Sequence, residues 1–124
     1  MIDLHTHTIA SDGACTPEEL VVRASKARLT VLSVTDHDTF GGCADAAVAC
    51  GRYGIEFVTG IEVTAVAAER DVHILGYFLD AESLSFNEFL TVQRLRRLDR
   101  VREMLARLRD HGIELDVDAV LPPG

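Results

Sequence analysis

The residues that could carry out chemistry are histidines and carboxylates spread in order through the first part of the chain. His5 and His7 are separated by one residue, and such a pair on a β-strand points to the same face, so both imidazoles could bind one metal ion. The other candidate ligands follow in the order Asp12, His37, Glu62 and His73. Imidazole nitrogen and carboxylate oxygen without thiolate suit Mn²⁺, Zn²⁺ or Fe²⁺ better than Ca²⁺ or a structural zinc finger.

Six candidate ligands are more than a single ion with an open coordination position requires. We therefore expect a cluster of two or three divalent ions, with Glu62 placed centrally enough to bridge two of them. Such a cluster lowers the pKa of a bound water and clamps the attacking and leaving oxygens of a phosphoryl displacement. The pattern predicts metal-assisted hydrolysis of a phosphoester, with a metal-bound hydroxide as the nucleophile.

Each of these residues also has a structural interpretation when it is taken alone. His5 and His7 could be buried strand histidines, and Asp12 could be a turn residue. His37 could belong to a surface ion cluster with its neighbouring aspartates. Glu62 lies in an otherwise apolar segment, where an unpaired carboxylate is costly. The metal site is favoured because the structural interpretations require several independent coincidences in one order.

The elements that must position these residues alternate between strands and helices. Strands are predicted at residues 2–5, 31–35 and 56–64, and helices after Thr16, which begins a capping box with Glu19, and at residues 41–53. This order with short connections favours parallel strands flanked by helices, an α/β fold. His5, His37 and Glu62 are each expected at or near the C-terminal end of a strand, the edge where such folds bind ligands. Asp36 and Asp38 are expected to orient His37 or other ligands.

The second part of the chain is expected to begin with a hairpin and to continue as one long helix. Residues 63–67 and 72–78 could pair around residues 68–71, and residues 85–110 show a helical pattern that Gly112 ends. Residues 91–110 carry seven arginines against three acids. Most of these arginines fit a solvated helix face, but Arg94 and Arg97 are candidates to bind a phosphate of the substrate.

Composition narrows the class of protein. A net charge of −8 over 124 residues argues against stable binding to duplex nucleic acid and suits a site that concentrates cations. The three cysteines form no C-x-x-C pair, which favours a reducing cytosol. The chain opens without the pattern of a signal peptide, and no apolar run approaches the ~20 residues of a membrane span. The sequence therefore predicts a cytoplasmic protein with a small phosphorylated substrate.

The sequence resembles the PHP (polymerase and histidinol phosphatase) family. The motifs that carry the resemblance are D-L-H-T-H-T at residues 3–8, S-D-G at 11–13, T-P-E-E-L at 16–20, T-D-H-D at 35–38, G-I-E-V-T at 60–64 and H-I-L-G-Y at 73–77. Within the family, the sequence is most similar to small phosphoesterases that act on nucleoside 3′,5′-bisphosphates and short RNA ends. The resemblance implies removal of a 3′-phosphate from such a nucleotide.

The resemblance also implies a fold and a ligand set. Residues 1–80 would form the N-terminal, metal-binding part of a distorted (β/α)7 barrel, and residues 81–124 would begin a helical insertion, truncated here. The site would be trinuclear and would commonly hold Mn²⁺, with Zn²⁺, Fe²⁺ or Mg²⁺ as alternatives. The implied metal ligands are His5, His7, Asp12, His37, Glu62 and His73.

Family members carry further ligands, a later histidine and a D-x-H motif, that these residues do not include, so the chain is expected to be the N-terminal half of such an enzyme. Two alternatives stay open. The protein could be a phosphatase of the histidinol-phosphate type, or a non-catalytic, truncated PHP module that binds metal.

Overall fold

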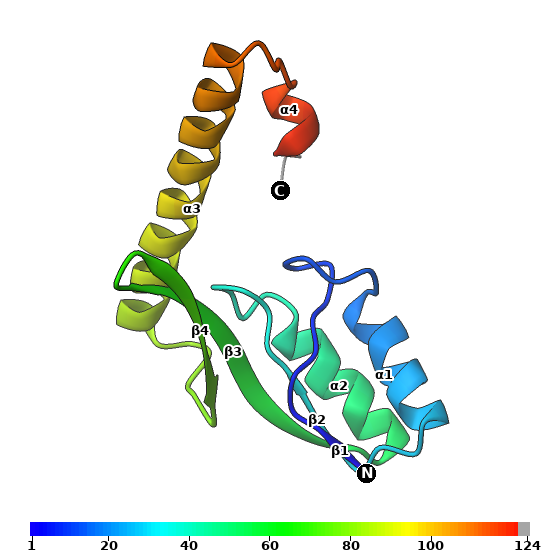
Figure 1. Cartoon of the computed structure of the whole chain (residues 1–124). Helices are drawn as coiled ribbons and strands as arrows, with labels where there is room; N and C mark the ends of the chain where they lie inside the picture. Colours follow the sequence, from blue (N-terminus) through cyan, green and yellow to red (C-terminus); the bar gives the residue numbers. More distant parts are fainter. Residues whose placement is uncertain (122–124) are drawn as a thin grey trace. The chain divides into compact units, whose positions relative to one another are not determined.

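The computed structural model of the chain describes residues 1–121 (Figure 1). The fold divides into two compact units, Met1–Asn87 and Glu88–Gly124. The end of the predicted insertion, residues 122–124, lies outside the described residues. The predicted boundary between a metal-binding part and an insertion at residues 80 and 81 stays a prediction.

The first unit has an α/β fold, as the sequence predicted, with a layer of helices packed on a sheet. Its sheet has the order β1-β2-β3-β4 and is formed by β1 (Ile2–Asp3), β2 (Val31–Val34), β3 (Glu56–Ala67) and β4 (Arg70–Tyr77). The first three strands are parallel and β4 is antiparallel. Helices α1 (Pro17–Lys26) and α2 (Cys43–Tyr53) lie side by side along this sheet (Figure 1). The buried core between these layers consists of Val21, Ala24, Leu32, Val34, Ala46, Ala49, Cys50 and Ile55.

Strand β3 changes partners along its length. Residues 56–59 pair with β2 in parallel, and residues 60–67 pair with β4 in antiparallel. The change falls at Gly60, where a Cβ atom would overlap the Ser33 hydroxyl and lie 2.8 Å from Thr35 Cγ2. Glycine is required here because the neighbouring segment approaches the backbone too closely for any side chain. The change of partner thus falls where side chains of the β2 segment lie against the β3 backbone.

The hairpin between β3 and β4 is tighter than the sequence predicted. The predicted connection of residues 68–71 is wrong, because pairing continues to Ala67 and Arg70 and leaves only Ala68 and Glu69 in the loop. Both loop residues have positive φ values, 50° and 63°. Positive φ at both central positions is the mark of a type I′ turn, which normally uses asparagine and glycine. The sequence concealed this turn because alanine and glutamate carry no such signal.

The two cysteines of α2 face the core of the first unit. Cys43 and Cys50 are free thiols and buried. Cys43 Sγ lies 3.6 Å from the Gly60 carbonyl oxygen. Burial raises the pKa of the Cys43 thiol, against the hydrogen bond to Gly60 and together with the charge of Asp36, and burial alone raises the pKa of Cys50. Both side chains therefore stay protonated at neutral pH.

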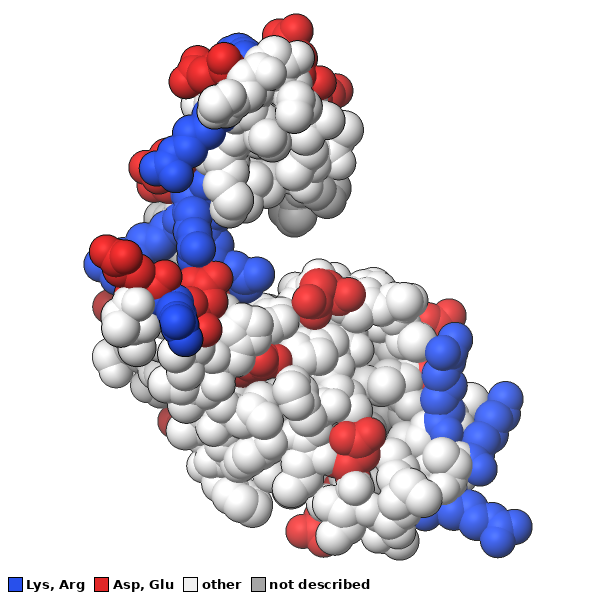
Figure 2. Space-filling model, viewed as in Figure 1, with Lys and Arg blue, Asp and Glu red and all other residues white. Residues whose placement is uncertain are grey.

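The second unit contains most of a long helix. Helix α3 (Leu84–Asp110) agrees with the predicted helix at residues 85–110, and Gly112 follows it with a φ of 79°. A short helix that the sequence did not predict, α4 (Val117–Val120), begins where the Asp116 side chain accepts a hydrogen bond from the backbone N–H of Asp118. Figure 2 shows arginine side chains gathered along α3. Among residues 1–121, no helix combines the length and the apolar character that crossing a membrane requires.

The capping box at the start of α1 gives a test of local stability. The Thr16 hydroxyl accepts a hydrogen bond from the Glu19 N–H, and the Glu19 carboxylate accepts one from the Thr16 N–H. We expect Thr16→Ala to lower the free energy of unfolding by about 1 kcal/mol in a denaturant titration, because an N-cap acceptor is lost. Thr16→Ser, which keeps the hydroxyl, should leave stability unchanged.

The same capping box predicts a pH dependence. Its backbone and side-chain hydrogen bonds from Thr16 lower the pKa of Glu19 from its ordinary value of 4.5. The stabilisation by ionised Glu19 is therefore present above pH 4.5 and is lost as the pH falls through the lowered pKa. The difference in stability between wild type and Glu19→Ala, which removes the ionised acceptor of the Thr16 N–H, should narrow in acid. A difference that widens in acid would contradict this account.

Candidate metal centre

Backbone hydrogen bonds fix Glu62 beside His37. The Glu62 N–H donates to the Asp36 carbonyl oxygen at 3.1 Å, and the Asp38 N–H donates to the Glu62 carbonyl oxygen at 3.0 Å. His37 and Glu62 thereby form an isolated parallel bridge beyond the end of β2. Partners in a parallel bridge carry their side chains on the same face of the sheet. The pairing of β2 with β3, interrupted after Thr59, thus resumes at the residues that carry the candidate ligands.

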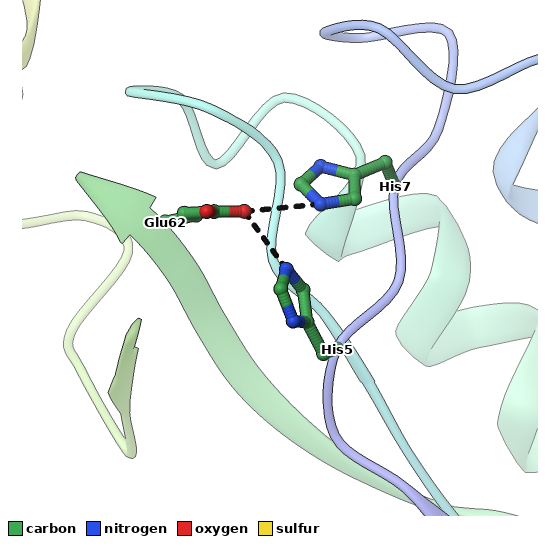
Figure 3. A group of neighbouring side chains, drawn as sticks. All are labelled: His5, His7 and Glu62. Carbon is green, nitrogen blue, oxygen red and sulfur yellow. Dashed lines mark hydrogen bonds and ion pairs between the residues drawn. The ribbon is translucent and has the colours of Figure 1, made fainter. Parts of the chain in front are cut away.

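The first two histidines lie beyond β1 and not within it, so the predicted strand at residues 2–5 is too long. The chain between them is nevertheless held to the segment of β2. Thr6 donates from its hydroxyl to the Ser33 carbonyl at 2.7 Å, and its own carbonyl accepts the Thr35 N–H at 2.8 Å. His5 and His7 flank this anchored residue and extend to one side, as their spacing predicted (Figure 3).

Four histidines surround the Glu62 carboxylate, which is 3% exposed. Its Oε2 atom lies 2.9 Å from His5 Nε2 and 3.0 Å from His7 Nε2 (Figure 3). His37 Nε2 lies 3.8 Å from the same oxygen. The other oxygen, Oε1, lies 2.7 Å from His73 Nδ1. The two oxygens therefore face different histidines, as a bridging ligand requires.

His73 reaches Glu62 across the antiparallel pair. Glu62 pairs with Leu75, so His73, two residues earlier on β4, is its diagonal neighbour. Diagonal neighbours on one face of an antiparallel pair lie within reach of long side chains. The change of partner within β3 thus places Glu62 between a histidine that follows β2 and a histidine on β4.

Asp12 lies on the far side of His7 and His37. Its Oδ2 lies 3.3 Å from His37 Nε2, and its Oδ1 lies 3.4 Å from His7 Nδ1. Among the residues that the structure describes, His7 Nδ1 is buried without a hydrogen-bond partner, because the contact with Asp12 lacks hydrogen-bond geometry. Two atoms that approach without a hydrogen bond can both donate lone pairs to a common cation. The structure therefore brings all six predicted ligands together, while their role as ligands stays a prediction.

The donor geometry fits divalent cations. Two ligands that each lie ~2.1 Å from an ion and subtend a right angle are ~3.0 Å apart. The N···O distances of 2.9, 3.0, 3.3 and 3.4 Å in this cluster are close to that value. Donor atoms within 4.8 Å of one another form three overlapping groups, namely His5, His7 and Glu62; His7, Asp12 and His37; and His37, Glu62 and His73.

The three donor groups share ligands, which limits how many of them can hold a metal ion at the same time. A neutral imidazole has one free lone pair, so His7 and His37 can each serve one ion at a time. Glu62 has two oxygens and can serve two ions. These side chains would therefore leave coordination positions open to water, substrate or further protein ligands.

Glu62 is prepared to act as an anion. Burial opposes its ionisation, but the hydrogen bond from His5, the charge of His37 and the hydrogen bond from His73 outweigh burial. Together they hold the pKa of Glu62 below its ordinary value. The carboxylate is thus charged at neutral pH, which is the form that binds cations.

The residues that hold the ligands in place were only partly predicted. The Asp36 side chain accepts hydrogen bonds from Thr8 and Ser11, and Asp38 Oδ1 accepts one from the Thr64 N–H at 3.2 Å. The predicted role of both aspartates in orienting ligands stays a prediction. Sequence reasoning missed Thr8 and Ser11, although their position between His7 and Asp12 was a usable signal.

Sequence reasoning also missed Tyr77. The Tyr77 hydroxyl donates to the carbonyl oxygen of Leu4, the residue before His5, at 2.6 Å. No sequence signal connects Tyr77 with Leu4.

The two arginines predicted to bind a substrate phosphate, Arg94 and Arg97, lie on α3 in the second unit. Arg94 donates to the Thr91 hydroxyl at 3.1 Å. Their predicted contact with substrate stays a prediction.

Comparison with known proteins identifies the family of this chain. A sequence profile of the PHP domain matches residues 3–117. This chain belongs to the PHP domain family. The 3′,5′-nucleoside bisphosphate phosphatase of Chromobacterium violaceum is 43% identical over 112 residues, which are 90% of this chain and 39% of that protein. The 5′-3′ exoribonuclease Rnm of Escherichia coli K12 is 40% identical over 108 residues, 86% of this chain and 37% of that protein.

A solved structure has a similar fold. It is an amidohydrolase from Chromobacterium violaceum with bound sulfate and no metal, and it superposes with a TM-score of 0.85 at 42% sequence identity. The superposed region covers 94% of this chain and 41% of the amidohydrolase chain. The four-stranded sheet is thus part of a PHP barrel, as the resemblance implied. The chain spans 37% to 41% of the length of these relatives.

The central position of Glu62 among the candidate ligands gives a direct test of metal binding. In Glu62→Gln the side chain keeps its size, but a neutral amide has only one oxygen to donate and cannot bridge two cations. We expect this variant to bind at least one Mn²⁺ ion fewer per chain by equilibrium dialysis and elemental analysis. Glu56→Gln, an exposed position on the same strand, is the matched control and should bind as wild type does. Equal stoichiometry in Glu62→Gln and wild type would contradict the central role of Glu62.

Proposed function

We propose that this chain is the metal-binding part of a PHP phosphoesterase that holds two or three divalent ions. The observation that carries the proposal is the buried Glu62 carboxylate, whose two oxygens face separate histidines at 2.9 and 2.7 Å. All six proposed ligands would bind through a nitrogen or an oxygen atom, which supports Mn²⁺ as the bound ion, with Zn²⁺, Fe²⁺ and Mg²⁺ as alternatives. Residues 1–80 would form the metal-binding part, and residues 81–124 would begin the helical insertion.

The burial pattern supports access from one side. The side chains of Asp12, His5 and His73 are 66%, 51% and 49% exposed, while that of Glu62 is 4% exposed. Glu62 thus forms the floor of the centre, and the exposed ligands form a rim that an anionic substrate can reach. Divalent ions held here would activate water for attack on a phosphoester and neutralise charge on the phosphate. The protein groups fix the ions and orient the phosphate at the rim.

The proposed substrate is a phosphomonoester, the 3′-phosphate of a nucleoside 3′,5′-bisphosphate or of a short RNA end. The names of the relatives, a nucleoside bisphosphate phosphatase and an exoribonuclease, support this class. A second phosphate on the substrate would need a cation of its own, and Arg94 and Arg97 are the proposed donors. We also propose a cytoplasmic location, which the three free cysteines support.

The histidines provide the first test of this function. His7→Ala removes a ligand that two of the three donor groups share. We expect the variant to fold, to lose at least one bound Mn²⁺ per chain and to lose phosphate release from a nucleoside 3′,5′-bisphosphate by about 100-fold or more. His111→Ala, at an exposed histidine after α3, is the matched control and should retain both properties.

Three outcomes would change the proposal. A folded His7→Ala with unchanged metal content and activity would overturn the assignment of the centre. A wild-type protein that binds Mn²⁺ but releases no phosphate would favour a non-catalytic metal-binding module. Turnover of histidinol phosphate in preference to the bisphosphate would favour a phosphatase of that other type.

The arginines can be tested separately with two substrates. Removing a charged donor to phosphate costs about 1.5–3 kcal/mol, so Arg94→Ala or Arg97→Ala should raise KM for a nucleoside 3′,5′-bisphosphate by about tenfold or more. KM for p-nitrophenyl phosphate, which has no second phosphate, should not change. Arg109→Ala, on the same helix, is the control. Equal KM effects on both substrates, or none, would contradict a contact with the second phosphate.

A further inference from the structure

The loop at residues 8–13, which joins two of the candidate ligands, is folded around a single buried threonine. Thr8 is 0% exposed. Its carbonyl oxygen accepts the N–H groups of Ser11 and Gly13 at 3.1 and 2.9 Å, and its hydroxyl accepts the N–H of Ala10 at 3.1 Å. The position of the whole loop therefore depends on what holds Thr8.

The Asp36 carboxylate, 1% exposed, holds this threonine from both its backbone and its side chain. Asp36 Oδ1 accepts the Thr8 N–H and the Ser11 hydroxyl, and Oδ2 accepts the Thr8 hydroxyl, each at 2.7 Å. Hydrogen bonds to a charged acceptor are about twice as strong as neutral ones. Gly42 leaves room for them, because a Cβ there would lie 2.5 Å from Asp36 Oδ2 and 2.6 Å from Thr8 Oγ1.

The turn that ends the loop fits the same arrangement. At Gly13 a Cβ atom would overlap the His7 carbonyl and lie 2.7 Å from the Thr8 nitrogen, so the chain closes back on itself without a side chain. The loop is thus compact, and the backbone N–H groups of Ala10, Ser11 and Gly13 are directed to Thr8. It leaves the Asp12 side chain 66% exposed, so Asp12 is positioned by its loop and not by packing of its own.

Asp36 also connects the loop to the rest of the centre. Its carbonyl oxygen accepts the Glu62 N–H at 3.1 Å, and the next residue is His37. One residue therefore holds three segments of chain together: the loop with Asp12, the segment after β2 and the strand with Glu62. The distance between Asp12 and His37 depends on this connection, whereas the Glu62 contacts of His5 and His73 are made from other segments.

We propose that Asp36 is a positioning residue that sets the ion occupancy of the group formed by His7, Asp12 and His37. The proposal rests on the proposed function only in requiring that the centre binds divalent ions. Asp36 acts through Thr8 and Ser11, which donate hydrogen bonds to both of its carboxylate oxygens. Its loss should weaken one ion of the cluster and spare an ion held through Glu62.

The experiment measures Mn²⁺ binding isotherms of the purified protein by equilibrium dialysis with elemental analysis. Loss of a side chain that orients a metal ligand typically costs 10–100-fold in affinity. We expect Asp36→Ala and Thr8→Val to weaken the binding of one ion per chain by about that factor and to leave the remaining stoichiometry as in wild type. Ser11→Ala, which removes one of the three hydrogen bonds, should have a smaller effect on the same ion.

Controls separate positioning from loss of stability. Val21→Ala removes methyl groups from the core on α1, away from the loop, and should lower the unfolding temperature while the isotherm keeps its wild-type form. If Asp36→Ala does not fold by circular dichroism, Thr8→Val and Ser11→Ala decide the question. Folded variants with wild-type isotherms would overturn the proposal, and so would a uniform weakening of every ion.

Failure of the proposed function gives a different result. If the wild-type protein binds Mn²⁺ but releases no phosphate, the proposed phosphoesterase activity is wrong. The binding isotherms of the Asp36 and Thr8 variants still test the positioning role. Loss of one ion in those variants would then support the positioning role in a non-catalytic centre. A wild-type protein that binds no Mn²⁺ would overturn the positioning role as well.

Discussion

The burial of one charged carboxylate is the constraint on which the first unit depends. A carboxylate taken out of water without partners is strongly destabilising, whereas one with several hydrogen bonds and opposite charges can stay ionised. Glu62 is 3% exposed and is surrounded by imidazoles, which hold its pKa low in spite of its burial. Those imidazoles come from three separate parts of the chain, so the tertiary fold and the electrostatics of the centre require each other.

The sheet meets this constraint through a strand that serves two partners. Because β3 is parallel to β2 over its first residues and antiparallel to β4 over the rest, Glu62 can face a histidine from each side. A purely parallel sheet would place its next strand after a long crossover. The hairpin supplies His73 only 11 residues after Glu62, and Gly60 leaves room for the side chains of Ser33 and Thr35 at the change of partner. The position of the centre thus follows from strand pairing.

Local signals in the sequence predicted what depends on local chemistry. The capping box at Thr16, the end of α3 before Gly112 and the alternation of strands and helices were all visible, since each rests on neighbours in sequence. The order of histidines and carboxylates indicated a shared centre because strand ends converge. The contacts between Asp36 and Thr8 and between Tyr77 and Leu4 could not be predicted, because they join segments 28 and 73 residues apart. The Ala68–Glu69 turn was missed because neither residue favours positive φ.

The buried thiols of α2 have a consequence for chemical durability. Peroxides and similar oxidants attack the thiolate, and their attack is slow where a cysteine is protonated and shielded from solvent. The raised pKa of Cys43 and Cys50 keeps these sulfurs in the resistant form. Within residues 1–121, the six candidate ligands include no sulfur atom, so oxidants that consume thiolates would leave the centre intact. Reaction with such oxidants is therefore expected to be slow at Cys43 and Cys50 and to spare the candidate ligands.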